Sequence, residues 1–191
     1  MEIDLDRAGV ALAGDMNPIA EAALAALLAS GGRSSSASDA DVLLISCPLL
    51  PGAENMDVGA TLRPAREAAA AMAMRGRGRI IFLMSAIAGM PMRRYPDFSA
   101  ETAGLLAGMR TLAMEFGPKV LVNAVGFGLI EAKKVVAGDV AMLSHAPTGR
   151  PGTLDEAVAA ALFLCDPMNS YTTGQMLVVD GGWSAGYGRN F

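Results

Sequence analysis

The sequence has little charge, few aromatic side chains, two cysteines and one histidine. Only 18% of its 191 residues are charged, against about a quarter in a typical soluble domain. Aromatic residues make up 5% of the chain, whereas hydrophobic residues make up 52%. A surface this poor in charge predicts that part of it is covered by another chain.

Several classes of protein are excluded by what is missing. The 15 basic and 19 acidic residues give a net charge of −4, which argues against nucleic acid as a partner. No apolar run approaches the roughly 20 residues of a membrane span, and residues 1–6, MEIDLD, are acidic where a signal peptide is basic. Two cysteines form no disulfide framework, which indicates a reducing compartment. We therefore expect a cytoplasmic protein that binds neither nucleic acid nor membrane.

Short apolar runs alternate along the chain with Ala- and Leu-rich segments of helical length. The runs predict five buried strands, at 9–14, 42–46, 79–84, 120–125 and 176–179. The longer segments predict four helices, at 18–28, 63–75, 99–116 and 155–165, the second with Pro64 in its first turn and the last capped by Thr153. Strands and helices in this alternation are typical of one α/β domain with a parallel sheet covered on both faces. Residues 31–40, rich in serine and glycine, are expected to form a flexible linker.

Three stretches of the chain carry the motifs of a known family. Residues 76–89 (GRGRIIFLMSAIAG), 119–132 (KVLVNAVGFGLIEA) and 149–187 (GRPGTLDEAVAAALFLCDPMNSYTTGQMLVVDGGWSAGY) resemble the short-chain dehydrogenase/reductases. The last stretch reproduces the final helix, final strand and tail of that family. The resemblance implies a single domain over residues 1–191 with a doubly wound, Rossmann-like parallel sheet. We expect this sheet to be truncated to about five strands, without the family's second and third.

The resemblance also implies that the cofactor site is degenerate. In the family, a turn of the form T-G-x-x-x-G-x-G lets backbone N–H groups approach the pyrophosphate of a dinucleotide. The matching residues 13–20 are AGDMNPIA, so that only Gly14 remains, Pro18 and Ala20 replace the later glycines, and Asp15 adds a negative charge. The segment from Gly14 to Asp41 is too short for the family's two further strands, since one βαβ unit needs roughly 30 residues. We predict that this chain binds neither NAD nor NADP, and that NAD belongs to a partner subunit.

The family's catalytic side chains are replaced as well. The positions of its serine, tyrosine, lysine and asparagine hold Ala86, Phe98, Thr102 and Gly59. Because each such group typically contributes about 10²–10⁴ in rate, the chain is predicted to be inactive by itself. A displaced site could use Tyr95, Ser85 and Arg93 or Arg94, but Pro96 makes the backbone at Tyr95 a loop rather than helix.

Three roles remain for such a chain. The resemblance favours a non-catalytic subunit of a hetero-oligomeric dehydrogenase, in which two active chains oxidise a β-hydroxyacyl-CoA with NAD and two chains are inactive. The candidate interface residues are Ala107, Thr111, Phe116, Leu162, Phe163 and Trp183. The first alternative is a homo-oligomeric module that binds acyl-CoA or another small ligand. The second is a nucleotide-independent enzyme that uses His145 or Cys47 in the emptied pocket. No spacing of Cys, His or carboxylates suggests a metal site.

The missing strands raise a question of handedness. If the helix at 18–28 keeps its family face and leads directly to the strand at 42–46, that crossover is left-handed, against a preference of about 98%. We expect the helix to keep this face, opposite the helix at 99–116, and residues 30–40 to pass around the edge of the sheet. The many methionines are expected in the core, at Met72, Met74, Met84, Met109 and Met114, with a methionine-rich partner surface as the alternative.

Overall fold

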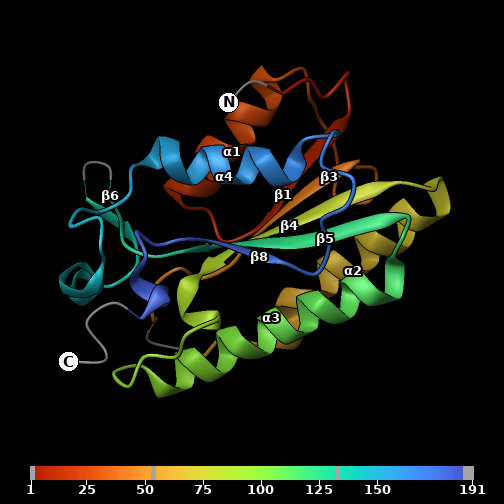
Figure 1. Cartoon of the computed structure of the whole chain (residues 1–191). Helices are drawn as coiled ribbons and strands as arrows, with labels where there is room; N and C mark the ends of the chain where they lie inside the picture. The colour runs from red at the N-terminus through yellow and green to blue at the C-terminus, as the bar shows by residue number, and fades with distance from the viewer. Residues whose placement is uncertain (1–2, 53–54, 132–133, 187–191) are drawn as a thin grey trace.

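A computed structural model of the chain describes residues 3–52, 55–131 and 134–186. Within them, a six-stranded parallel sheet of order β2-β1-β3-β4-β5-β8 lies between two layers of helices (Figure 1). Its strands are β1 (Gly9–Gly14), β2 (Arg33–Ser34), β3 (Val42–Ser46), β4 (Gly78–Ser85), β5 (Val120–Phe127) and β8 (Met176–Val179). Two further strands, β6 (Ile130–Glu131) and β7 (Val135–Ala137), form a small antiparallel sheet. The predicted α/β fold with a Rossmann-like sheet is confirmed.

Each face of the large sheet is covered by a pair of helices. Figure 1 shows α1 (Pro18–Ala29) and α4 (Leu154–Cys165) on one face, and α2 (Val58–Arg75) and α3 (Pro96–Phe116) on the other. Three short 3₁₀ helices, η1 (Ala86–Ala88), η2 (Val140–His145) and η3 (Trp183–Ala185), complete the described elements. No helix in the described part of the chain is long and apolar enough to cross a membrane.

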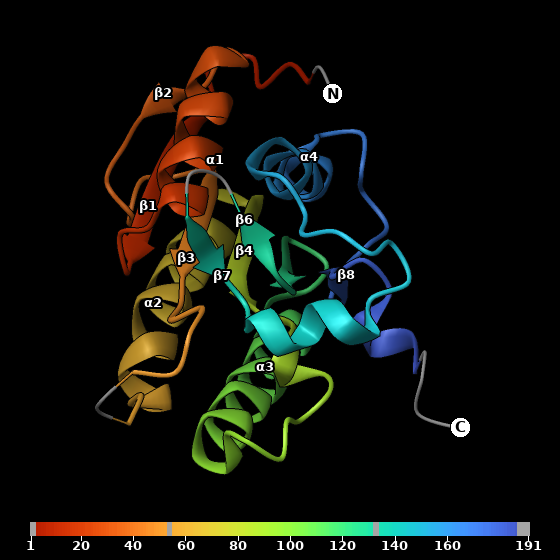
Figure 2. The ribbon, with the colours of Figure 1, turned by 90° about the vertical axis from the view of Figure 1, so that its left-hand side faces the viewer.

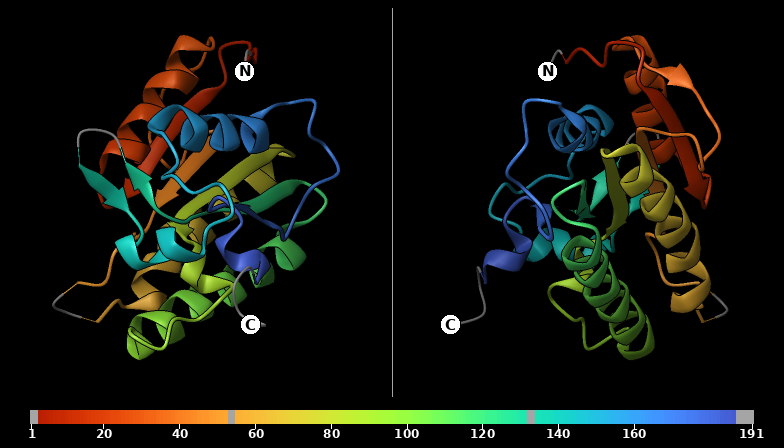
Figure 3. Two further views of the ribbon diagram at one scale, coloured as in Figure 1. Left: turned by 60° about the vertical axis from the view of Figure 1, so that its left-hand side comes forward. Right: turned by 90° about the vertical axis from the view of Figure 1, so that its right-hand side faces the viewer.

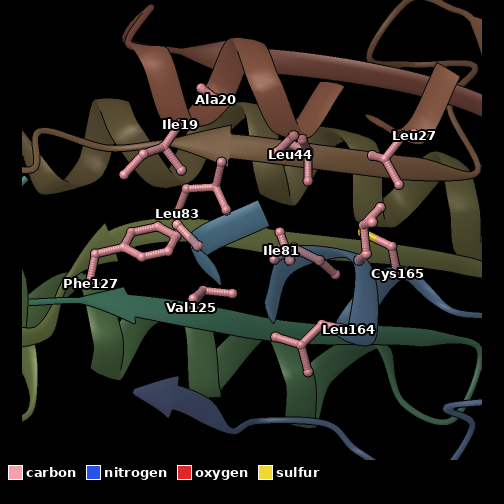
Figure 4. Close-up of a cluster of buried hydrophobic side chains, with 14 of the residues drawn as sticks. Ile19, Ala20, Leu27, Leu44, Ile81, Leu83, Val125, Phe127, Leu164 and Cys165 are labelled. Carbon is pink, nitrogen blue, oxygen red and sulfur yellow. The ribbon is translucent and has the colours of Figure 1, made fainter. Parts of the chain in front are cut away.

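Side chains of alternate strand residues fill two separate core layers. On the α1/α4 face, Leu44, Ile81 and Val125 of three neighbouring strands pack with Ile19 and Leu164 of the helices (Figure 4). On the other face, Ile45, Phe82 and Ala124 of the same three strands pack under α2 and α3. Because both faces are covered, the strands are apolar at nearly every position, which is why the sequence shows continuous runs rather than alternation.

Strand β2 is the main departure from the prediction. The sheet has six strands rather than five, because Arg33–Ser34 pairs with the amino end of β1 where only a flexible linker was expected. The Arg33 N–H donates to the Ala8 carbonyl at 2.9 Å and the Ser35 N–H to the Val10 carbonyl at 3.0 Å. A strand of two exposed residues has no apolar pattern, so only its pairing with β1 reveals it.

This strand resolves the question of handedness. Helix α1 lies on the face opposite α3, as predicted, and carries the chain from β1 outward to β2. The return from β2 to β3 crosses the opposite face, where Arg75 of α2 donates to the carbonyls of Ser38 and Ala40 at 2.8 and 2.6 Å. The connection from β1 to β2 runs outward on one face of the sheet, and the connection from β2 to β3 runs inward on the other face. The two crossovers therefore have the same hand, and the preference for right-handed connections is met.

Two helix starts show what capping contributes. Helix α4 begins at a capping box, in which the Glu156 N–H donates to Thr153 Oγ1 and the Thr153 N–H donates to Glu156 Oε2, as the sequence suggested for Thr153. Helix α2 begins at Val58, five residues before the predicted start, because Asp57 accepts the Ala60 N–H at 2.9 Å. Pro64 therefore lies inside α2 and not in its first turn.

Candidate functional site

A cavity of about 610 Å³ lies at the carboxyl ends of β1 and β3. We call it the carboxyl-edge cavity. Figure 2 looks toward this edge of the sheet, where β6 and β7 lie between the two helical layers. The chain leaves β1 toward β2 on one side and β3 toward β4 on the other. Open α/β sheets bind their ligands at such a switch point. Its described lining residues are Asp15, Met16, Asn17, Cys47, Pro48, Leu49, Leu50, Gly52, Asn55, Met56, Phe98, Glu101 and Val136.

The N-terminus of α1, which would bind the diphosphate of a dinucleotide, is closed by the chain itself. Asn17 Oδ1 accepts the N–H groups of Ile19 and Ala20 at 3.1 and 3.0 Å, and its Nδ2 donates to Ser46 Oγ at 2.7 Å. Pro18 has no N–H to offer, and the Glu21 N–H donates to the Asn17 carbonyl at 3.0 Å. Phosphate binding at a helix N-terminus depends on free N–H groups, so the residues present do not fit the diphosphate.

Gly14, the one glycine of the family motif that remains, has a structural reason to be there. Its φ of +93° is in the region that favours glycine, and a Cβ at this position would lie 2.0 Å from the Ser46 carbonyl oxygen. That close approach allows the Asp15 N–H to donate to the same carbonyl at 3.0 Å. Gly14 therefore serves the contact between β1 and β3.

The four catalytic positions of the family hold side chains without acid–base chemistry. Phe98 packs against Ile87 and lines the carboxyl-edge cavity, while Thr102 is fully buried one turn later and donates from Oγ1 to the Phe98 carbonyl at 2.7 Å. Ala86 is buried in η1 and Gly59 is exposed in the first turn of α2. Of the four, only Phe98 lines the cavity, and its ring has no hydroxyl to move a proton.

The displaced tyrosine is held in a different arrangement. Tyr95 precedes α3 with φ −133°, outside the helix, as Pro96 predicts. Its hydroxyl donates to the Asp139 carboxylate, and Arg94 lies 3.5 Å from the same carboxylate with its guanidinium 5.6 Å from the centre of the Tyr95 ring. The hydrogen bond to Asp139, followed by burial and the negative charge, raises the pKa of Tyr95. A tyrosine that transfers protons near neutral pH needs a lowered pKa, so this environment opposes catalysis. Ser85, the displaced serine, is buried and accepts the Ile87 N–H at 3.4 Å.

The Tyr95–Asp139 pair makes a titration test possible. Replacing Asp139 by Asn keeps an acceptor for the Ala141 N–H but removes the charge, so the Tyr95 pKa should fall toward the ordinary value of about 10. Replacing Arg94 by Met should instead raise the Tyr95 pKa, because the Arg94 charge lowers it. Both can be followed by NMR of ring-labelled tyrosine against pH. A Tyr95 pKa below the ordinary value in the unaltered chain would contradict this geometry.

The remaining reactive side chains do not assemble into a site. Cys47 lines the carboxyl-edge cavity but is fully buried, and burial followed by the charge of Asp15 raises the pKa of its thiol. His145 is exposed at the end of η2 and is not among the residues that line that cavity. In the portion of the chain that the structure describes, no group of three or more His, Cys, Asp or Glu could hold a metal ion.

A second cavity, of about 640 Å³, lies at the amino ends of the strands, the edge that faces the viewer in the right-hand view of Figure 3. Arginines dominate its charge, but the most buried of them, Arg79, donates to the carbonyls of Asn169 and Pro167 at 2.7 and 3.0 Å. These contacts attach the segment after α4 to the sheet. Arg79 therefore has a structural role, and burial lowers the pKa of its guanidinium.

The candidate interface residues divide into two groups. Ala107 and Thr111 are exposed on α3, Phe116 is half-buried, and Phe163 of α4 is 44% exposed. Leu162 and Trp183, in contrast, are only 7% and 4% exposed, so they offer little surface to another chain. Leu162 packs in the α1/α4 core, and Trp183 packs in the cluster that holds Phe98.

Comparison with known proteins identifies a matching family and several relatives of this chain. The family described as enoyl-(acyl carrier protein) reductase matches residues 16–184. A 3-oxoacyl-[acyl-carrier-protein] reductase FabG of Aquifex aeolicus is 34% identical over 110 residues, which is 55% of this chain and 44% of that protein. An NAD-dependent glycerol dehydrogenase of Listeria innocua is 33% identical over 115 residues, 57% of this chain and 45% of that protein. The chain thus spans less than half the length of these curated relatives.

Solved structures share the fold at lower sequence identity. A 3-ketoacyl-(acyl-carrier-protein) reductase from Brucella melitensis, complexed with NADH, superimposes with a TM-score of 0.77 at 18% identity, over 95% of this chain and 100% of that one. A short chain oxidoreductase from Pseudomonas aeruginosa, described as containing an atypical catalytic center and bound to NADPH, has a TM-score of 0.72 at 22% identity, over 94% and 98% of the two chains. At this identity the likeness establishes the fold alone.

Proposed function

Because this chain belongs to the short-chain dehydrogenase/reductase family, its departures from that family can be interpreted, and we propose that it is a non-catalytic subunit of a hetero-oligomeric dehydrogenase. The observation that carries the proposal is the closed N-terminus of α1. Asn17 occupies the N–H groups of Ile19 and Ala20 that the diphosphate of NAD or NADP would need. Without a hydride carrier, the chain supplies no redox chemistry of its own.

The catalytic positions support the same role. Phe98 and Thr102 stand where the family has its tyrosine and lysine, and neither can donate or hold the proton of an alcohol. Losing one such group slows an enzyme by about 10²–10⁴, and groups that act as a unit are not additive. NAD would therefore be bound by an active partner subunit, which also contributes the catalytic side chains.

Exposed apolar side chains support the proposal of a permanent interface. Met74 of α2 and Met114 of α3 were expected in the core, but both are exposed. With Phe163 of α4 they place large apolar side chains on the exposed sides of three helices. Interfaces are enriched in methionine and aromatic residues and depleted in charge. The low charge of the whole chain, 18%, agrees with this.

The substrate of the complex follows from resemblance. The chain resembles the inactive subunit of the heteromeric 2-[hydroxy(phenyl)methyl]succinyl-CoA dehydrogenase of anaerobic toluene degradation. The name of the Aquifex relative, a 3-oxoacyl-[acyl-carrier-protein] reductase, also specifies an acyl group in its substrate. The active subunit would accordingly oxidise a β-hydroxyacyl-CoA, in a tetramer of two active and two inactive chains.

Assembly provides the test of this role. Co-expressed with its active subunit, the chain should elute as a heterotetramer by size-exclusion chromatography with light scattering. Replacing Ala107 and Thr111 together by Arg should disrupt the tetramer, because both are exposed on one side of α3 and a charge buried there would be unpaired. The matched control replaces Ala25 and Ala29 by Arg, two exposed alanines that are also four apart, on α1. A stable monomer indifferent to any dehydrogenase would refute the subunit role and favour the ligand-binding module.

A further inference from the structure

The carboxyl-edge cavity keeps the size of a ligand site although it does not fit a dinucleotide. Its volume of about 610 Å³ lies within the range of roughly 300–1,000 Å³ that small-molecule sites occupy. It also lies at the switch point of the sheet, the place where this class of fold binds ligands. The question is which chemistry its walls accept.

Most of the wall is apolar. Leu49, Phe98 and Val136 are buried and form one part of it. Met16 and Leu50 also line the cavity, but they are 66% and 40% exposed. When an apolar ligand binds at a concave site, the large apolar side chains exposed there are removed from water, which favours binding. The cavity therefore favours a ligand with an apolar body.

The charge of the cavity has one sign. Asp15, from the loop after β1, and Glu101, from the second turn of α3, are the only charged residues among its described lining. Within the described ranges, neither carboxylate lies within 4.0 Å of a basic nitrogen or accepts a hydrogen bond. Among the residues that the structure describes, two carboxylates from separate elements thus line a largely apolar cavity without a paired cation, which disfavours phosphates and favours a positive charge.

We propose that the carboxyl-edge cavity binds a small apolar molecule that carries a protonated amine. The apolar body contacts Leu49, Leu50 and Phe98, and the ammonium group is held between Asp15 and Glu101. Asn17 adds an amide to the rim, but its oxygen is already bound to the N–H groups of α1. The inference rests on the proposed function in one respect, namely that no nucleotide occupies the same cavity.

The test compares three probes of one shape on the full-length chain. These are 4-phenylbutylamine, 4-phenylbutanol and 4-phenylbutyrate, titrated at neutral pH by NMR. The amine is expected to bind at least 10-fold more tightly than the alcohol, and the carboxylate more weakly than either. Replacing Glu101 by Gln or Asp15 by Asn should reduce this preference several-fold. Both variants should fold, because neither side chain makes a hydrogen bond within the described structure. The control is Glu67→Gln, an exposed carboxylate of α2 outside the cavity.

Each outcome bears on one proposal. Equal affinity for the three probes, no binding at millimolar concentration, or a preference that survives both cavity variants would overturn the amine site and leave co-assembly with a dehydrogenase untouched. NADH is titrated in the same series, and micromolar binding of NADH would overturn the absence of a cofactor from this chain. An amine preference that Glu101→Gln and Asp15→Asn reduce, and that Glu67→Gln leaves intact, supports the site.

Discussion

Replacing Thr102 by Lys and Phe98 by Tyr, the change that restores the family's catalytic pair, should strongly destabilise the protein instead of activating it. Thr102 is fully buried, and its hydroxyl donates to the Phe98 carbonyl at 2.7 Å. The Thr102 hydroxyl contacts only backbone carbonyls, those of Phe98 and Ser99, so a lysine ammonium there would have no described carboxylate as its partner. An uncompensated buried charge costs about 3–5 kcal/mol, which is a large part of the roughly 5–15 kcal/mol that stabilises a domain.

The single variants separate the two effects. Phe98→Tyr should change stability by less than about 1.5 kcal/mol, since Phe98 lines the carboxyl-edge cavity and a hydroxyl can extend into it. Thr102→Val keeps the shape but loses the hydrogen bond, and should cost about 1 kcal/mol. Urea denaturation followed by circular dichroism measures all three variants. A folded double variant with NAD-dependent turnover would refute both the structural and the functional interpretation.

Gly14→Ala should have the second large effect. The substitution forces alanine into a conformation with φ near +93°. It also places the alanine Cβ 2.0 Å from the Ser46 carbonyl oxygen. The left-handed conformation alone costs about 1–2 kcal/mol. The clash with Ser46 would also push β1 away from β3, which adds to this cost. We therefore expect a loss of at least about 3 kcal/mol in the free energy of unfolding.

Gly76 is the matched control for this change. Its φ is +85°, yet no heavy atom lies within 4 Å of the position that a Cβ would take. Gly76→Ala should therefore cost only the conformational part, about 1–2 kcal/mol. Equal destabilisation by the two variants, measured by urea denaturation, would show that β1 and β3 do not approach as closely at Gly14 as described.

The apolar runs were sufficient to predict five of the six strands of the sheet, because strands buried on both faces leave an unbroken apolar signal. The position of Tyr95 outside α3 was also predictable, since proline restricts the residue before it, although α3 begins at Pro96 and not at the predicted Ser99. Strand β2 was not, because Arg33 and Ser34 are exposed and only the edge of β1 makes them a strand. The early start of α2 depended on Asp57 as a cap, a signal that was present in the sequence but not used.

The substitutions at the family's motif positions could be predicted from the sequence, but the contacts that the substituted residues make could not. The degenerate glycine turn and the positions of Phe98 and Thr102 follow from aligning the family's motifs with this sequence. Asn17 before Pro18 is also an ordinary signature of a helix start, with an N-cap followed by proline at the first position. The hydrogen bond from Asn17 to Ser46, and the convergence of Asp15 with Glu101 on one cavity, depend on elements far apart in the sequence.

Strand β2 also limits how far a fold of this kind can be shortened. The two residues keep the chain on the outer side of β1 before it returns across the opposite face of the sheet, so both crossovers keep the same hand although a single short strand lies beyond β1. A deletion that removed them would connect α1 directly to β3 with the disfavoured hand. Insertions between Ser34 and Asp41 meet no such limit, since a longer segment can extend outward as additional strands. This edge of the sheet is therefore where chain length can vary over evolution without rebuilding the core.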